Sequence, residues 1–174
     1  MPGTLRNLFR SSAPSRKVWS RRRLFVEPME ARRLLAVFTV DANDPTANEP
    51  GDKLFAQIQE AVDIAESGDK IKVNGGVYEP FTVSKDNLTI RAASEESPPV
   101  IDASGAEAGI TIDADGVTLR DLTVENADGS GVYVSGNSNT LADNTARNNG
   151  LADPTAGGFS LVDADDNTLI GNVA

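Results

Sequence analysis

The 174-residue chain contains no cysteine and no histidine. Without cysteine, disulfide cross-links and thiolate chemistry are excluded. Without histidine, the commonest general base is missing, and the two absences together remove the usual zinc ligands and every Ser-His or Cys-His nucleophile pair. Any active site or metal site would therefore have to use carboxylates, lysine or arginine.

Aromatic residues and long apolar runs are also scarce. Phe, Trp and Tyr make up 5% of a chain that is 39% hydrophobic, so a core must consist mainly of small and β-branched side chains. Such a composition favours many thin, repeated layers. No segment approaches the roughly 18 apolar residues of a membrane-spanning helix, so we expect no transmembrane span.

Charge is divided unevenly along the chain, whose net charge is -10. Residues 1–36 hold nine Lys/Arg and two Glu, whereas the rest holds seven Lys/Arg and 24 Asp/Glu, a net charge of -17. The first segment shows no helical or alternating period, and its Ser, Pro and Arg content predicts a disordered basic segment. Clustered arginines suit nucleic acid, but the acidic domain would repel it, so we expect no nucleic-acid partner.

Residues 26–28 (Val-Glu-Pro), followed by 32–36 (Arg-Arg-Leu-Leu-Ala), resemble the N-terminal signature of a class of exported bacterial proteins. In that signature an arginine-rich run precedes Leu-Glu-Pro and then Arg and Leu-Leu-Ala; this chain has Val26 where Leu is usual. A standard secretory signal is not indicated, because the apolar run 34–40 is short and interrupted by Thr39. The resemblance implies export, and the alternatives are a nucleic-acid tail or a disordered start without a targeting role.

The pattern changes at residue 37, where we place the start of a folded domain covering residues 37–174. Asp52 is suited to cap the start of a helix, and Gly68 is suited to end it. Between them, apolar residues recur at helical spacing: Leu54, Ile58, Ala61, Val62 and Ala65. The sequence therefore predicts one amphipathic helix of about four turns.

Short β-type runs separated by turn residues account for most of the rest. Most have three or four residues, fewer than the usual five or six, so they suit a coil that turns a corner every few residues. The runs are Phe38–Val40, Ile71–Val73, Phe81–Val83, Leu88–Ile90, Val100–Ile101, Ile110–Ile112, Val117–Leu119, Leu122–Val124, Val132–Val134, Phe159–Val162 and Thr168–Ile170.

An internal sequence repeat indicates how these short runs are organised. Leu119, Leu141 and Leu169 align in one column at spacings of 22 and 28 residues, and a threonine precedes each of them. Asn144 and Asn172 share a second column, in which their amides can hydrogen-bond along the stack. The longer spacing reflects an insertion around residues 149–157. A period of this length is typical of a solenoid.

The repeat, written Gly-Ile-x-Ile, Asn/Gly-x-Thr-Leu and Asn-x-x-x-Asn-Asn-Gly, resembles the parallel β-helix repeat of pectate-lyase-like proteins. Upstream, residues 58–62, 68–71 and 76–78 resemble the cap and first rung of such domains. The resemblance implies an all-β, right-handed parallel β-helix with an N-terminal amphipathic capping helix. The helix would cover unpaired backbone at the first rung and so block edge-to-edge growth.

At the other end, residues 168–174 stop inside a rung without a cap. The sequence therefore predicts that the domain is truncated at its C-terminal end. We expect the native protein to continue, or the uncapped rung to self-associate or fray.

The resemblance also implies two kinds of chemistry. Polysaccharide lyases with this fold use calcium held by aspartates and an arginine or lysine base, and related hydrolases use clustered aspartates with a histidine. Arg120 and Arg147 lie one position out of register in neighbouring rungs, so they are expected near each other and are the candidate basic ligand-binding residues. We prefer the interpretation that they are surface charges, and we assign no catalytic residue.

Three acids and two aromatic residues are further candidates. Asp163, Asp165 and Asp166 can form acidic turns that hold calcium weakly, although turn geometry alone also favours aspartate there. Tyr133 and Phe159 follow the opening glycines and can stack on a sugar ring, although such residues often belong to the core. No cofactor other than calcium is considered.

We therefore expect an exported or cell-surface scaffold without catalytic activity, whose partners are polysaccharide or other cell-envelope components. The alternative is the N-terminal part of a calcium-dependent polysaccharide lyase or of a polysaccharide hydrolase. Fold alone does not separate these functions.

Overall fold

The computed structural model describes residues 34–49, 53–153 and 156–174. Most of the basic segment 1–36, including the Val-Glu-Pro part of the export signature, lies outside the described residues. Its disorder and its targeting role therefore stay predictions.

Fifteen short strands and one helix make up the described part of the chain. In chain order they are β1 (Val37–Val40), β2 (Leu54–Phe55), α1 (Ile58–Ile64), β3 (Lys70–Val73), β4 (Val77–Tyr78), β5 (Phe81–Val83), β6 (Thr89–Ala92), β7 (Val100–Asp102), β8 (Ala108–Ile112), β9 (Thr118–Arg120), β10 (Thr123–Glu125), β11 (Ser130–Val134), β12 (Thr140–Ala142), β13 (Thr145–Arg147), β14 (Phe159–Leu161) and β15 (Thr168–Ile170).

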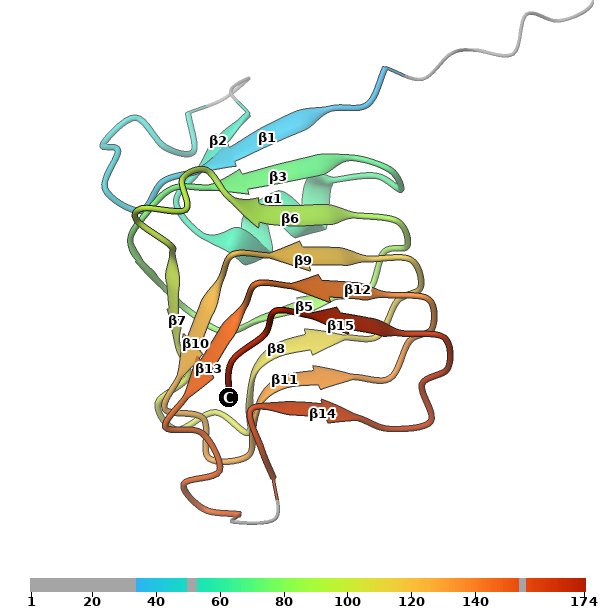
Figure 1. Ribbon diagram of the computed structural model, residues 1–174. Coiled ribbons are helices and arrows are strands. Elements are labelled where there is room, and N and C mark those ends of the chain that lie inside the picture. Colours follow the sequence, from blue (N-terminus) through green and yellow to red (C-terminus); the bar gives the residue numbers. More distant parts are fainter. Residues whose placement is uncertain (1–33, 50–52, 154–155) are drawn as a thin grey trace, which may run out of the picture. The chain divides into compact units, whose positions relative to one another are not determined.

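The strands form three parallel sheets that wrap around one core (Figure 1). Sheet A has the order β2-β1-β3-β6-β9-β12-β15, sheet B the order β4-β7-β10-β13, and sheet C the order β5-β8-β11-β14. From β3 onward the chain visits sheets A, B and C in turn and then stacks the next strand on the first. This arrangement is a parallel β-helix, as predicted.

The predicted repeat columns are confirmed by the strand register. Leu119 pairs with Leu141, and Leu141 with Leu169, in the middle of sheet A. Leu119 and Leu141 are fully buried, whereas Leu169 is 42% exposed because no further rung covers it in the described residues. The other inward columns consist mainly of Ile, Val and Ala, in agreement with the scarcity of aromatic residues.

The corners of the coil depend on residues in the left-handed backbone conformation. Most corners between two sheets place one such residue just before an inward-pointing side chain, and Asn, Asp and Gly, which favour this conformation, occupy most of these positions. Between sheets C and A they are Asn87, Gly116, Ser138 and Asp166; between A and B they are Asp121, Asp143 and Gly171; between B and C they are Asn126 and Asn148.

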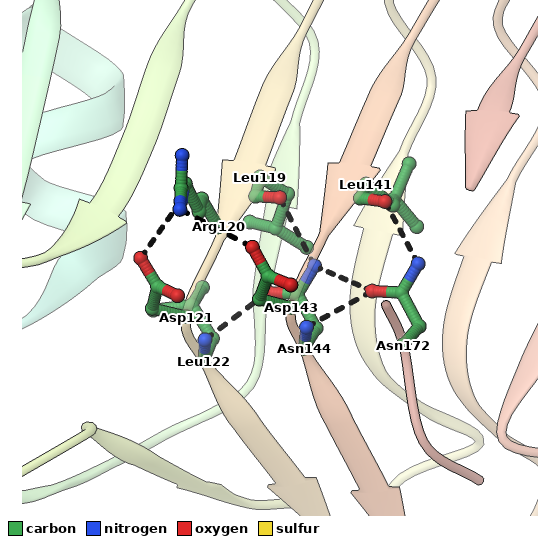
Figure 2. A network of polar contacts seen from close by, with 8 residues as sticks. All are labelled: Leu119, Arg120, Asp121, Leu122, Leu141, Asp143, Asn144 and Asn172. Atoms are coloured by element: carbon green, nitrogen blue, oxygen red, sulfur yellow. Dashed lines mark hydrogen bonds and ion pairs between the residues drawn. The ribbon is translucent and has the colours of Figure 1, made fainter. Parts of the chain in front are cut away.

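Inward-pointing asparagines then satisfy the buried backbone at these corners. At the corner between sheets A and B, Asn144 Oδ1 accepts the Leu122 N–H at 3.1 Å, and Asn144 Nδ2 donates to the Leu119 carbonyl at 3.0 Å (Figure 2). Asn172 repeats this pattern one rung later, with bonds to Asn144 N–H and to the Leu141 carbonyl. The predicted amide stack is therefore present, because Asn144 Nδ2 also donates to Asn172 Oδ1 at 3.1 Å.

Asparagine side chains also bind backbone N–H groups at the corners between sheets C and A and between sheets B and C. Asn139 Oδ1 accepts the Val117 N–H at 2.7 Å, and Asn167 Oδ1 accepts the Asn139 N–H at 2.8 Å. Asn149 Oδ1 accepts the Ala127 N–H at 3.0 Å. Within the described residues, the amide nitrogen of Asn139 is the one buried side-chain polar atom without a partner.

The capping helix is present but shorter than predicted. Helix α1 packs against β1, β2, β3 and β5, with Ile58, Ala61 and Val62 buried against the first rung. The prediction that the helix includes Leu54 was wrong: Leu54 and Phe55 form β2, which pairs with β1 at the edge of sheet A. Strand pairing and burial of Phe55 against Phe38, with ring centroids 5.9 Å apart, override the helical spacing there. The predicted cap Asp52 lies outside the described residues, and Gln57 is the N-cap.

A lysine completes the C-terminal end of α1. Lys85 Nζ donates to the carbonyls of Val62 at 3.1 Å and Ala65 at 2.8 Å, and also to that of Asp63. These carbonyls carry the negative end of the helix dipole and have no partner inside the helix. Lys85 therefore joins the cap to the loop that follows β5.

At the opposite end, the last described rung leaves several apolar side chains exposed. They are Leu161, Val162, Leu169, Ile170 and Val173. Self-association through this rung stays a prediction.

We predict that Asn144→Ala destabilises the fold by about 2–4 kcal/mol, because the Leu122 N–H and the Leu119 carbonyl both lose a buried partner. Urea denaturation of the full chain measures the loss. Asn137→Ala removes a single hydrogen bond at an exposed corner and serves as the matched control. An equal effect of the two substitutions would contradict the role given to the buried amides.

We also predict that Lys85→Met lowers stability by about 1–2 kcal/mol, since three helix carbonyls lose a charged donor. Lys70→Met is the control, because Lys70 is exposed and its side chain forms no hydrogen bond or ion pair with the described residues. Thermal melts followed by circular dichroism compare the two. An unchanged melting temperature for Lys85→Met would show that Lys85 does not hold the cap.

Candidate functional site

A hollow on the outer face of sheet C has a volume of about 610 Å³. Its floor is formed by β8, β11 and β14, and its rim includes part of the insertion after β13. We call it the sheet C groove. It is lined by Glu107, Ala108, Thr111, Asp113, Gly129, Ser130, Tyr133, Asp153, Ala156 and Ser160.

Strand alternation explains the central column of the groove. Thr111, Tyr133 and Ser160 pair with one another across β8, β11 and β14. Their neighbours in sequence, such as Val132 and Val134, point into the core and are fully buried. The three polar side chains therefore face outward in one row.

A glycine brings Ser130 to the same surface. A Cβ on Gly131 would lie 2.6 Å from the Asn149 side-chain amide, so Gly131 faces the interior where sheets B and C meet. Val132 also faces the interior, so two successive positions point inward and the alternation shifts by one residue. Ser130 consequently lines the groove beside Tyr133.

Ser130 is the most buried polar residue that lines the groove. Ser130 is only 6% exposed, yet its side chain makes no hydrogen bond. Its oxygen is still reached from the groove, because Asn139 Nδ2 is the one fully buried side-chain polar atom without a partner among the described residues. This hydroxyl is therefore available to a group that enters the groove.

The predicted insertion forms the rim. Gly150 N–H donates to the Gly129 carbonyl at 2.7 Å, and Ala152 N–H donates to the Asp128 carbonyl at 2.9 Å. These bonds fasten the start of the insertion to the preceding rung at the corner between sheets B and C. The longer leucine spacing in the sequence thus corresponds to a wall beside the groove.

Acidic groups stand at both ends of strand β8. Glu107 precedes the strand and Asp113 follows it, and Asp113 Oδ1 accepts a hydrogen bond from Ser135 Oγ at 2.7 Å. A smaller hollow of about 340 Å³ adjoins the groove, shares Glu107 and adds Asp128. Among the residues that the structure describes, no lysine or arginine lines either hollow.

The two aromatic candidates occupy different environments. Tyr133 is half-buried and lines the groove. Phe159 pairs with Val132, points inward and packs against the hydrophobic core, so it does not line the groove. The structure therefore does not bring the two rings together on one surface.

The candidate arginines lie on different sheets and are each paired with acids. Arg120, at the end of β9 in sheet A, contacts Asp121 at 3.1 Å and Asp143 at 3.2 Å (Figure 2). Arg147, at the end of β13 in sheet B, contacts Glu125 at 2.6 Å. The structure does not place these two arginines together in one site, and neither lines the groove.

The three acids considered for calcium lie in the turn between β14 and β15. Asp163 and Asp166 adopt positive φ angles of 51° and 56°, and the Asp165 N–H donates to Asn137 Oδ1. Among the described residues, no group of three or more acidic side chains is arranged to hold a metal ion. The residues fit their turn geometry, and a calcium site there stays a prediction.

A second outer surface differs from the groove in charge. On the outer face of sheet A, Lys72, Arg91 and Arg120 pair in one column. The neighbouring column contains four threonines in register, Thr89, Thr118, Thr140 and Thr168. The outer faces of sheets A and C thus carry opposite charge.

Comparison with known proteins does not narrow the function: no protein-family model matches the chain, and no curated protein matches it. Likeness to pectate-lyase-like proteins is therefore supported at the level of the parallel β-helix only. In the part of the chain that the structure describes, no helix is long and apolar enough to cross a membrane.

Sequence reasoning missed Ser130, Glu107 and Asp113 as groove residues. The signal that was available is the column alignment, since Ser130 stands immediately before the repeat glycine Gly131 and pairs with Ala108. The inward position of Gly131 shifts the inward–outward alternation of β11 by one residue. This position depends on the contact with Asn149, which the sequence alone does not show.

Asp102, which does not line either hollow, has a shifted pKa. The hydrogen bond from Ser104 Oγ to Asp102, supported by Asn126 Nδ2 and the Ser104 N–H, lowers the pKa of Asp102 below the ordinary aspartate value. Because the pKa is lowered on folding, the carboxylate's contribution to stability is present above the unfolded pKa and is lost as pH falls through the folded one.

We predict that Ser104→Ala raises the pKa of Asp102 toward its ordinary value, because the largest stabilising contact of the carboxylate is removed. Carbon-detected NMR titration of the Asp102 carboxyl group measures this change. Ser94→Ala, at an exposed serine on the opposite side of β7 in the sequence, is the control. The same pKa in wild type and Ser104→Ala would exclude the assigned cause.

Proposed function

We propose that this chain is a non-catalytic β-helix scaffold that binds carbohydrate through the sheet C groove. The observation that carries the proposal is the position of Tyr133, an aromatic ring on the groove floor next to the unpartnered hydroxyl of Ser130. The proposal extends to export or display at the cell surface, with polysaccharides of the cell envelope as partners.

The composition of the groove suits a sugar ring. An aromatic side chain offers an apolar face against which the C–H face of a pyranose can pack, while its hydroxyl remains available for hydrogen bonding. Thr111, Ser130 and Ser160 add hydroxyl groups on the floor, and Asp113 adds a carboxylate that is held by Ser135. A volume of about 610 Å³ lies in the range of small-molecule sites.

The geometry also suits a polymer. Parallel strands lie about 4.8 Å apart, so equivalent groups on successive rungs recur at roughly the length of one sugar ring. Thr111, Tyr133 and Ser160 form such a series along the axis of the coil. A linear oligosaccharide lying across the strands can therefore contact one rung per sugar.

A catalytic role has less support in the described residues. Proton abstraction beside a sugar carboxylate needs a base and a cation at one place. Arg120 and Arg147 are each bound to carboxylates, lie on different sheets and do not line the groove. The lyase or hydrolase alternative is therefore an outcome to test and not our proposal.

Export is supported by the resemblance of residues 26–28 and 32–36 to a bacterial export signature. Most of that stretch lies outside the described residues. A fusion of residues 1–36 to a reporter protein, with Arg32 and Arg33 replaced by serine in the matched control, tests export by cell fractionation.

We predict that Tyr133→Ala reduces oligosaccharide affinity by about tenfold or more, because stacking on an aromatic ring contributes roughly 0.5–1.5 kcal/mol beyond its buried area. Tyr133→Phe keeps the ring and should retain most of the affinity. Isothermal titration calorimetry with linear tetrasaccharides, chosen from a glycan array probed with the full chain, measures both variants.

Phe159→Leu is the control for general packing effects, since Phe159 points inward. Binding that is lost equally in Tyr133→Ala and Tyr133→Phe would contradict a stacking role. Release of unsaturated products from an acidic polysaccharide with calcium, abolished by Arg120→Ala or Arg147→Ala, would replace the scaffold proposal with the lyase alternative.

A further inference from the structure

The sheet C groove is acidic on a molecule whose cations lie elsewhere. Glu107, Asp113 and Asp153 line it, and Asp128 lines the hollow beside it. The described residues contain seven Lys/Arg, and none of them lines either hollow. They are Lys53, Lys70, Lys72, Lys85, Arg91, Arg120 and Arg147.

Most of these lysines and arginines are bound to other groups or lie on the outer face of sheet A. Lys85 is bound to the carbonyls of α1, and Arg147 is paired with Glu125. Lys72, Arg91 and Arg120 share the outer column of sheet A. No described lysine or arginine therefore forms an ion pair with Glu107 or Asp113.

Two of these carboxylates flank the stacking position. Glu107 and Asp113 stand at the two ends of β8, and Tyr133 lies on the adjacent strand β11, paired with Thr111 in the middle of β8. Glu107 is exposed, while Asp113 keeps one oxygen bound to Ser135. A ring packed on Tyr133 thus has an anionic group on either side.

The hydroxyl of Ser130, which opens into the groove, is a second and independent indication of a ligand. Ser130 is more than nine-tenths buried, lines the groove and has no side-chain hydrogen bond. A hydroxyl can accept a hydrogen bond from an ammonium group as readily as it can donate one to a sugar oxygen. Ser130 therefore fits a ligand that carries both kinds of group.

We propose that the sheet C groove selects oligosaccharides of amino sugars with free ammonium groups. This inference rests on the proposed carbohydrate-binding function and specifies its ligand class. Ammonium groups form charge-assisted hydrogen bonds with Glu107 and Asp113, which are stronger than bonds from a neutral amide or hydroxyl. Uronic acids would place carboxylates next to carboxylates, and the groove excludes them for that reason.

The test compares three tetrasaccharides by isothermal titration calorimetry on the full chain. They are β-1,4-linked glucosamine, its N-acetylated counterpart, and a tetramer of galacturonic acid. We expect the glucosamine tetramer to bind about tenfold or more tightly than the acetylated one, and the acidic tetramer to show no binding. The advantage of the glucosamine tetramer should shrink as salt is raised.

Single substitutions of the groove carboxylates test whether the groove is responsible for the selectivity. Glu107→Gln and Asp113→Asn keep shape and hydrogen-bonding capacity but remove charge, so each should reduce the preference for free amines several-fold. Glu79→Gln is the matched control, because Glu79 is exposed, has no side-chain partner and does not line either hollow. Tetralysine, which is cationic but not a sugar, controls for general attraction to an acidic protein.

Each outcome decides between the two proposals. Equal binding of the acetylated and free-amine tetramers, lost in Tyr133→Ala, would overturn the amino-sugar inference and keep the carbohydrate groove. Binding of tetralysine as tightly as glucosamine, or an equal effect of Glu79→Gln, would overturn the inference as well. Failure of every tetrasaccharide to bind would overturn both proposals.

Discussion

The whole coil depends on how its corners satisfy buried backbone groups. At most turns between sheets, one residue adopts the left-handed conformation and the next points inward. The side chains of Asn144 and Asn149 reach the N–H and carbonyl groups of the preceding rung at distances between 3.0 and 3.2 Å. An apolar residue at these positions would leave those groups unpaired, so the asparagine columns set where each rung lies on the one before it.

The register of the rungs determines which side chains fill the interior and which form the outer faces of the sheets. The column Leu119, Leu141 and Leu169 fills the interior beside sheet A, and the outward row of Thr111, Tyr133 and Ser160 forms the floor of the groove on sheet C. A scaffold of this kind is stabilised mainly by contacts between neighbouring rungs. Inserted residues can therefore project from one corner without disturbing the next rung, and the insertion after β13 forms a groove wall in this way.

The two outer faces differ in their distribution of charge. Cations gather on the outer face of sheet A, while carboxylates gather around Tyr133 on sheet C. On a flat, regular surface, ligand choice depends on the charge and hydrogen-bonding pattern of the exposed columns more than on a deep cavity. The proposed preference for amino sugars rests on this separation, whereas the carbohydrate-binding proposal rests on Tyr133 and Ser130.

The sequence by itself determined the coil, because its signals are local. Asn, Asp and Gly at left-handed corners, alternation of short strands and the 22-residue period can all be read from the chain, and the columns through Leu141 and Asn144 have the predicted register. Only the tertiary structure decided which residues meet. Leu54 lies in strand β2 because that segment pairs with the edge strand β1. The two candidate arginines form ion pairs with different acids. Ser130 lines the groove because Gly131 packs against Asn149. These outcomes depend on contacts between distant segments, and spacing along the chain does not encode them.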